Sequence, residues 1–199
     1  MKRKLRFEDI GRINDQKIEV KAGRLLISEP FMHDQYFGRS VVLLCEHNLD
    51  GTVGFILNKP MVMTVNEAMD DFPKIDGNVY FGGPVQSNMI HFIHRVGNKL
   101  PGSFEIANGI FWGGDFETLS FLIDTKQVNG NDVRFFAGYS GWEPKQLKKE
   151  LKEKTWIIGE GNLKYLFSED PDHLWREVLK NMGKEFSVIA NFPEDPTLN

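Results

Sequence analysis

The sequence predicts an α+β fold, with a mixed, mainly antiparallel and bifurcated sheet around which helices pack. Strand-like segments outnumber helical ones, and they follow one another through short turns more often than through helices. The chain has 199 residues, 41% of them hydrophobic and 26% charged, which is typical of a globular domain. We expect one domain at residues 21–190, after a polar lead-in at 1–20 and before a tail at 191–199.

Strands dominate the first part of that domain. Residues 23–28 form an apolar run that stops before a proline, and residues 31–39 indicate an irregular connection. Residues 40–46 are almost continuously apolar, which predicts a strand buried on both faces. Asp50–Gly51 is typical of a hairpin turn, so residues 52–58 are expected to return as the next strand.

The middle of the chain alternates helix signals with short strands. Thr64 and Glu67 have the spacing of a capping box, which predicts a short helix to about Asp71. Asp115 is a candidate N-cap for a second helix with an apolar face. Strands are expected at 78–81, 89–96, 104–106 and 110–112, the last two as a hairpin around Asn108–Gly109.

The last third is expected to mix strands and helices in sequence. A strand at 133–137 is followed by a charged helix that runs from Pro144 to Lys154. Further elements are a strand at 155–158, a helix from Asp170–Pro171 to about Met182, and a last strand at 187–190.

Charge and composition set limits on partners and compartment. The formal net charge is −4, which gives no general attraction to phosphate backbones or anionic membranes. No apolar run approaches the roughly 20 residues of a membrane span, so no membrane partner is expected. Cys45 is the only cysteine and lies in an apolar strand, which favours a buried thiol in a reducing, cytoplasmic setting.

Ser140 is the one serine with a nucleophile-like neighbourhood. A nucleophile elbow needs Gly-x-Ser-x-Gly, but the second glycine position is occupied by Trp142. We therefore interpret Gly138–Trp142 as a tight structural turn between a strand and a helix, and we assign no catalytic residue.

Metal and phosphate sites are not predicted, and neither is a cofactor. His91 and His94 lie on a strand with opposite parity, so their side chains should point to opposite faces. Glu46 and His47 lie at a polar hairpin tip, for which a plain turn is the commoner explanation. Gly82–Gly83 precedes a proline, which has no N–H group to donate to an anion, so a structural bend is favoured. A ligand-facing loop remains the alternative.

Two surfaces could contact partners. The helix after Pro144 carries five lysines, which a solvated face explains, although a phosphate-contacting patch remains an alternative. The sequence therefore disfavours nucleic acid as a partner but keeps it as an alternative. Tyr139 and Trp142 are expected to pack over the sheet edge, with a groove for a protein partner as the alternative.

Several motifs, in this order, resemble the bacterial AlgH/YqgE family over about residues 22 to 185. They are residues 23–30, 37–42, 46–47, 54–60 and 82–85, His94, residues 138–142, Gln146–Leu147, Glu150–Leu151, Trp156 and Leu174–Trp175. The resemblance implies a bifurcated α+β sheet with a small barrel-like part, in a cytosolic bacterial protein. It implies no mechanism, because the family's transcriptional-regulator label derives from a genetic link to alginate production.

Three functional hypotheses follow. The leading one is a non-enzymatic cytosolic protein with a regulatory role. The second is a small-ligand binder or enzyme that uses polar groups at strand ends, and the third is DNA binding through the lysine-rich helix. The candidate ligand or interaction surface comprises Arg39, Glu46, His47, Asn58, Gly82, Gly83, Tyr139 and Trp142.

Overall fold

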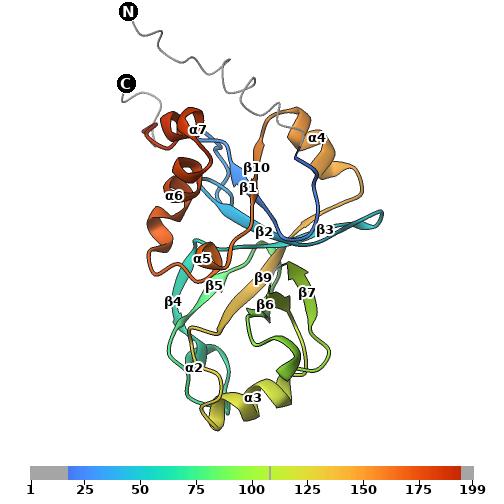
Figure 1. The fold of residues 1–199 in the computed structure, drawn as a ribbon, viewed down its shortest axis with the longest axis vertical. Coiled ribbons are helices and arrows are strands. Elements are labelled where there is room, and N and C mark those ends of the chain that lie inside the picture. Colours follow the sequence, from blue (N-terminus) through green and yellow to red (C-terminus); the bar gives the residue numbers. More distant parts are fainter. Residues whose placement is uncertain (1–17, 108, 194–199) are drawn as a thin grey trace, which may run out of the picture.

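The sheet divides at strand β9 (Val133–Trp142), which contacts a different set of strands along each half (Figure 1). In the computed structural model, which describes residues 18–107 and 109–193, the second half of β9 pairs with β3 (Gly51–Ile56). Its first half pairs in parallel with β5 (Asn78–Phe81). β6 (Val85–His94) runs antiparallel along the opposite edge of β9. This arrangement is the predicted bifurcation.

The main path of the sheet has the order β10–β1–β2–β3–β9–β6–β8–β7, and β4 pairs with β5 as a side pair. All pairings are antiparallel except that between β5 and β9. The remaining strands are β1 (Arg24–Ser28), β2 (Val41–Asn48), β4 (Pro60–Thr64), β7 (Phe104–Ala107), β8 (Ile110–Trp112) and β10 (Trp156–Glu160).

The path curls so that its far end returns to its beginning, which forms the barrel-like part. Ala107 at the end of β7 lies against Gly23, just before β1, so closely that Gly23 has no room for a side chain. The largest apolar core fills this part and includes Leu25, Leu43, Phe55 and Phe136.

The helices lie in three groups around the sheet, as Figure 1 shows. Three of them cover the first core, two lie at the lower end of the molecule, and one lies beside β10. In chain order they are α2 (Val65–Ala68), α3 (Phe116–Asp124), α4 (Gln146–Lys152), α5 (Leu163–Leu166), α6 (Leu174–Asn181) and α7 (Lys184–Ile189), with 3₁₀ turns η1 (Gly97–Lys99) and η2 (Pro171–His173).

Two smaller cores hold the outer helices. The lower one is built from β5, β6 and β9 together with α2 and α3, whose Leu119, Leu122 and Ile123 are buried as their helical spacing predicts. The third core lies under α4 and includes Trp142, Leu147 and Trp156.

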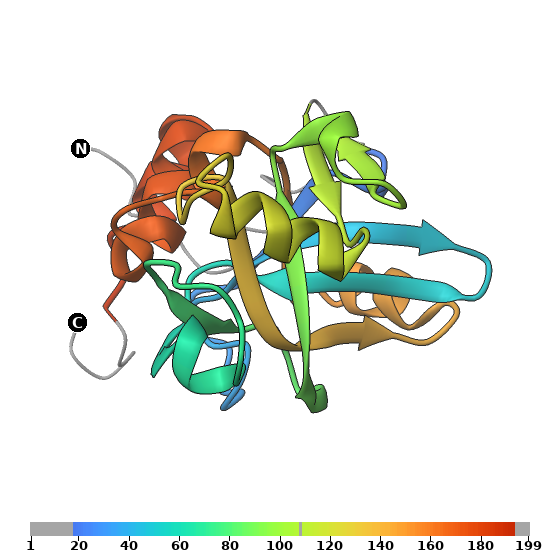
Figure 2. The same cartoon turned by 90° about the horizontal axis from the view of Figure 1, so that it is seen from below.

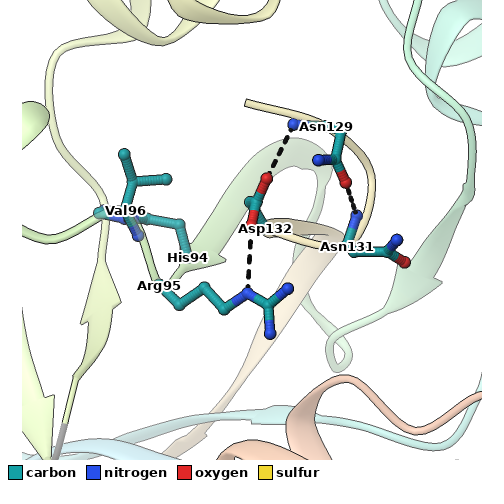
Figure 3. Close-up of polar contacts among 6 residues, drawn as sticks. All are labelled: His94, Arg95, Val96, Asn129, Asn131 and Asp132. Atoms are coloured by element: carbon teal, nitrogen blue, oxygen red, sulfur yellow. Dashed lines mark hydrogen bonds and ion pairs between the residues drawn. The ribbon is translucent and has the colours of Figure 1, made fainter. Parts of the chain in front are cut away.

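A polar turn fastens the start of β9 to the end of β6 (Figure 3). The Asp132 carboxylate accepts a hydrogen bond from Arg95 Nε at 3.1 Å and another from the backbone N–H of Asn129 at 3.0 Å. Asn129 in turn accepts from the N–H of Asn131 at 2.8 Å. These bonds close the turn over itself and fix the point at which β9 enters the sheet.

Several local predictions are confirmed. Thr64 and Glu67 form the capping box of α2, and Asp115 caps α3 by accepting the N–H of Thr118 at 2.7 Å. Gly51 adopts a positive φ of 145° at the predicted hairpin turn. The strand at 40–46 is buried throughout its apolar part, as β2 shows.

The predicted last strand at 187–190 is wrong, because these residues belong to helix α7 and its C-cap. Phe186 and Ile189 are buried at a spacing of three residues, which suits a helix face rather than the alternation of a strand. Strand β4 and helix α5 were also not predicted.

The predicted ends of the chain fall mostly outside the described residues. Residues 1–17 of the lead-in and 194–199 of the tail are not described. Val20 packs against the core under α4, and Phe192 stacks on Phe31 with ring centroids 5.6 Å apart. Within residues 18–107 and 109–193, no helix is both long and apolar enough to cross a membrane.

Candidate functional site

Three of the predicted residues line one open groove of about 610 Å³ on the face of the sheet. Glu46, Tyr139 and Trp142 contribute to it from β2 and β9. The groove lies where the β2–β3 hairpin projects beside the end of β9 and the start of α4, an arrangement visible in Figure 2. The other residues that line it are Asn48, Asp50, Gly51, Thr52, Val53, Val85, Gly141, Glu143, Pro144 and Gln146.

Strand register explains why five of these positions share a face. Glu46 is opposite Val53, and Val53 is opposite Gly141. Tyr139 is opposite Val85 and lies two residues from Gly141 in the same strand. Directly opposed residues, and residues two apart in a strand, project from the same side of a sheet. The five positions therefore form one continuous surface across four strands.

Gly141 leaves that surface hollow, because it has no side chain. A Cβ atom there would lie 3.2 Å from Cε2 of Tyr139 and 3.6 Å from Cγ2 of Val85. The backbone of Gly141 is not in the left-handed region, so its role is to provide space rather than to allow a turn. A larger residue at this position would fill the groove.

The charge of the groove has a single sign. Glu46, Asp50 and Glu143 are exposed carboxylates, and the groove's lining contains no lysine, arginine or histidine. Val53, Val85 and Tyr139 give it an apolar floor. An apolar floor with a rim of carboxylates suits a side chain that has an aliphatic stem and a positive end, since such groups bury the stem and keep the charge at the edge.

A carboxylate on α4 joins two tryptophans of the third core. Oε2 of Glu150 accepts hydrogen bonds from the indole N–H groups of both Trp142 and Trp156, each at 2.8 Å, and Oε1 accepts from Gln146 at 2.9 Å. The shared partner of the two tryptophans could not be read from spacing, because they come from different strands.

Arg39 and Asn58 lie together but do not line the groove. Asn58 accepts the N–H of Val41 at 2.8 Å and donates to the carbonyl of Arg39 at 2.9 Å. Arg39 donates to the carbonyl of Phe192 at 2.7 Å, and its guanidinium lies 4.8 Å from the ring centroid of Trp175. Both residues thus fasten the 31–39 connection and the C-terminal helices to the sheet.

Gly82 and Gly83 are buried where two backbones approach closely. A Cβ atom would lie 2.2 Å from the carbonyl oxygen of Gly138 at Gly82, and 2.3 Å from the carbonyl carbon of Tyr139 at Gly83. This geometry accounts for both glycines as a structural bend against β9. His47 lies on the exposed hairpin, where Nδ1 is 2.7 Å from Oγ1 of Thr52.

Ser140 does not lie in a turn, so that prediction is wrong. β9 continues to Trp142, and Ser140 is paired with Gly54 inside the sheet. Its hydroxyl donates to the carbonyl of Gly82 at 2.9 Å, and the residue is fully buried. The strand continues because Gly138, at φ 66°, absorbs the irregularity that the sequence suggested was a chain reversal.

The two histidines of β6 contact different cores, as their parity predicts. His91 packs on Phe55 and Tyr139, whereas His94 packs on Phe92 and Phe111. In the described part of the chain, no group of three or more His, Cys, Asp or Glu residues could hold a metal ion. Burial raises the pKa of the Cys45 thiol well above its ordinary value of 9.0, which disfavours a reactive thiolate.

His94 and Ser103 form a hydrogen-bonded pair without the geometry of a base and nucleophile. Nδ1 of His94 accepts the N–H of Val96 at 3.2 Å, so in the neutral ring the proton lies on Nε2. Nε2 then donates to the carbonyl of Gly113 at 3.0 Å, and the Ser103 hydroxyl donates to Leu100 at 2.7 Å. A protonated Nε2 cannot accept the serine proton.

Comparison with known sequences places the chain in a family. The sequence model of the AlgH-like family, DUF179, matches residues 25–187. A UPF0301 protein of Chlorobium limicola is 41% identical over 181 residues, which cover 91% of this chain and 97% of that relative. A UPF0301 protein of Cytophaga hutchinsonii is 42% identical over 178 residues, covering 89% and 98%.

Two solved structures share the fold. A crystal structure of a Corynebacterium diphtheriae protein has a TM-score of 0.77 at 20% identity and covers 94% of this chain and 100% of its own. The solution structure of AlgH from Pseudomonas aeruginosa has a TM-score of 0.70 at 24% identity, covering 90% and 98%. The fold agrees with the sequence matches, and the chain belongs to the AlgH-like family.

Proposed function

We propose that this chain is a non-enzymatic cytoplasmic protein with a regulatory role, and that it acts by binding alkylammonium groups in the groove on its sheet face. Lysine side chains of a protein partner are the ligands that this groove fits best. The observation that carries the proposal is the groove itself, whose rim has three carboxylates and whose lining has no positive side chain.

The chemistry of the groove supports binding at several points at once. The stem of a lysine can lie on Val53 and Val85, and its ammonium group can approach the face of Tyr139 or the carboxylate of Glu143. Exposed ion pairs contribute only about 0–1 kcal/mol each, so a useful affinity needs a segment with several lysines.

The state of the candidate catalytic groups favours binding over catalysis. The Ser140 hydroxyl is buried and already donates to a backbone carbonyl. His94 has its base nitrogen occupied by a backbone N–H. Each group therefore has a structural role that is complete without a substrate.

Thermal-shift measurement with a lysine-rich peptide tests the proposal. A ligand at 100 times its Kd stabilises the native state by about 2.7 kcal/mol, so the melting temperature should rise clearly. The triple variant Glu46→Gln, Asp50→Asn, Glu143→Gln should lose this rise. Glu169→Gln, which removes one exposed carboxylate outside the groove, should keep it.

Gly141→Val separates shape from charge. The substitution fills the hollow between Tyr139 and Val85 and leaves all three carboxylates in place. Loss of the peptide response in this variant supports binding in the groove, whereas an unchanged response contradicts it. Spermidine, tested in parallel, distinguishes a small polyamine from a protein segment: a stronger response to spermidine would favour the small molecule.

A further inference from the structure

A cavity of about 280 Å³ lies at the connection that leads from β1 to β2. It is lined by Pro30, Phe31, Met32, His33, Gly38 and Arg39, and none of these residues belongs to the groove. The lining includes two basic side chains and no aspartate or glutamate. A cavity lined by one sign of charge attracts groups of the opposite sign, so this one suits an acidic segment.

The carboxylates of the same connection are engaged in its own turns. Oε2 of Glu29 accepts the N–H of Phe31 at 3.1 Å. Oδ1 of Asp34 accepts the N–H groups of Tyr36 and Phe37 at 2.8 and 2.9 Å. Side chains that bond to nearby backbone in this way define a turn, so the backbone of the connection sets the positions of both carboxylates.

The residues that follow α7 meet the cavity through Phe192. The ring of Phe192 stacks on Phe31 with centroids 5.6 Å apart, and its carbonyl accepts a hydrogen bond from Nη2 of Arg39 at 2.7 Å. Phe31 and Arg39 both line the cavity. The described residues therefore end at Pro193, one residue beyond a contact with two sides of the cavity.

The next two residues of the sequence are acidic. Glu194 and Asp195 follow Pro193, and consecutive Cα atoms are 3.80 Å apart, so their Cα atoms lie at most about 8 and 12 Å from that of Phe192. Because the Arg39 guanidinium is bonded to Phe192 itself, either carboxylate can reach it without a change in the described fold. A hydrogen bond between two such charged groups is about twice as strong as a neutral one.

We propose that residues 194–199 dock in this cavity, as a strap that ties the C-terminal helices to the 31–39 connection. The carboxylates of Glu194 and Asp195 bind the guanidinium of Arg39, and the segment covers the cavity. Arg39 has a backbone φ of 49°, which costs a residue other than glycine free energy unless its surroundings fix the conformation. The docked strap is one more contact that fixes it.

Amide chemical shifts of the ¹⁵N-labelled full chain test the docking. The tail-neutral variant (Glu194→Gln, Asp195→Asn) should shift the amides of Met32, His33 and Gly38, which lie far from these substitutions in the sequence. Unchanged amides at all three positions would overturn the proposal.

A matched control separates the docking from a general effect of charge. The control variant (Asp124→Asn, Glu169→Gln) removes the same charge at two exposed sites outside the cavity. It should leave the amides of the cavity unchanged. Equal shifts in the control and tail-neutral variants would show that the cavity responds to net charge alone, and would reject the contact.

A spin label locates the segment itself. Cys45 is the only cysteine of the chain, and burial raises the pKa of its thiol, so in Thr197→Cys the new thiol is the reactive one. A nitroxide there should broaden the amide signals of Met32 and Gly38. The broadening should decrease at 1 M salt, where the screening length falls to about 3 Å, and in the tail-neutral background. Broadening that is the same under all these conditions would reflect only the attachment of the tail at Pro193, and would reject the docking.

A double-mutant cycle identifies Arg39 as the partner of the tail. The tail-neutral substitutions should lower the melting temperature of the wild type, and should have little effect in an Arg39→Gln background that circular dichroism shows to be folded. Equal losses in the two backgrounds would show that the carboxylates do not bind Arg39. The amide and spin-label measurements do not use this variant, so they test the docking even if Arg39→Gln does not fold.

Discussion

Glu150 is a shared hydrogen-bond acceptor in the core under α4. One of its oxygens accepts hydrogen bonds from the indole N–H groups of Trp142 and Trp156, which come from different strands. A buried donor left without an acceptor costs about 1–3 kcal/mol. The position therefore contributes to the stability of the core under α4.

Glu150→Ala should lower the free energy of unfolding by about 3 kcal/mol, since it removes the acceptor that the Trp142 and Trp156 indole N–H groups share. Glu150→Gln keeps an oxygen near the same place and should cost less, about 1 kcal/mol. Urea denaturation followed by tryptophan fluorescence measures both. Equal losses for the two variants would show that the lost bonds are not the cause.

The buried histidines predict how stability depends on pH. Burial lowers the pKa of both His91 and His94 below the ordinary value of 6.5. As pH falls through that value, the unfolded chain takes up protons that the folded chain does not, so the free energy of unfolding should decrease between pH 7 and pH 5. Stability that is flat or rising over this window would contradict the assignment.

The carboxylates that cap helices affect the free energy of unfolding at lower pH than the histidines do. Hydrogen bonds from Thr64 lower the pKa of Glu67 from 4.5, and those from Thr118 lower the pKa of Asp115 from 3.8. Their contribution is complete above these values and is lost only as pH falls below them. The loss between pH 7 and pH 5 is therefore assigned to the histidines.

His91→Phe tests that assignment at one residue. Nε2 of His91 is buried without a hydrogen-bond partner in the part of the chain that the structure describes, and the ring packs on Phe55 and Tyr139. Phenylalanine keeps the packing and removes the unpaired nitrogen, so stability should rise by about 1 kcal/mol at pH 7. The gain should be larger at pH 5, as measured by urea denaturation. A loss of stability at both pH values would mean that Nε2 has a favourable contact.

At the scale of elements, β9 and the segment at Gly82–Gly83 must approach closely for the bifurcated sheet to form. Gly138 has φ 66°, and a Cβ atom there would lie 2.6 Å from the carbonyl oxygen of Gly83. Gly141 in the same strand has only side-chain neighbours and no positive φ. Gly83 and Gly138 thus allow two backbones to approach closely, whereas Gly141 provides space in the groove.

Gly138→Ala and Gly83→Ala should each destabilise the protein by roughly 3 kcal/mol through backbone strain and clash. Gly141→Ala should cost less than about 1 kcal/mol, since the end of the Tyr139 side chain can move. Thermal denaturation of the three variants gives the comparison. Similar losses at all three positions would contradict the distinction between backbone approach and groove space.

Local signals predicted most of the elements, because capping residues, turns and apolar runs act within a few residues. Thr64, Asp115 and Gly51 are examples that the structure confirms. Elements that depend on pairing between residues far apart in the sequence could not be predicted from local signals. The pairing of Ser140 with Gly54 and of Tyr139 with Val85 continues β9 past the point where local sequence suggested a turn.

The residues of the candidate site, too, could be predicted only in part from local sequence. Glu46, Tyr139 and Trp142 were predicted from their polar or aromatic character. Register brings Glu46 and Tyr139 to one face of the sheet, whereas Trp142 borders the groove with its side chain buried in the core under α4. Arg39 and Asn58 had equally suitable chemistry, but their bonds to Phe192 and Val41 place them elsewhere. Glu143 and Gln146 were not predicted as site residues, because only the fold shows that α4 starts at the groove.

At the scale of the whole molecule, the distribution of charge decides between the remaining partners. The net charge of −4 and the carboxylates beside α4 oppose a phosphate backbone, although the helix itself is basic. Fluorescence anisotropy with duplex DNA should show no binding at physiological salt. Binding that falls steeply with salt and is lost in Lys148→Glu, Lys149→Glu would instead support the lysine helix as a nucleic-acid contact.

The recognition of lysine in the groove is tested most directly by amide chemical-shift mapping. The ¹⁵N-labelled protein is titrated with a lysine-rich peptide, and with the same peptide acetylated on every lysine, which removes the charge. We predict that the unmodified peptide shifts the amides of Thr52, Val53, Tyr139, Gly141 and Glu143, and that the acetylated peptide does not. Shifts confined to other surfaces, or equal shifts with both peptides, would contradict the account.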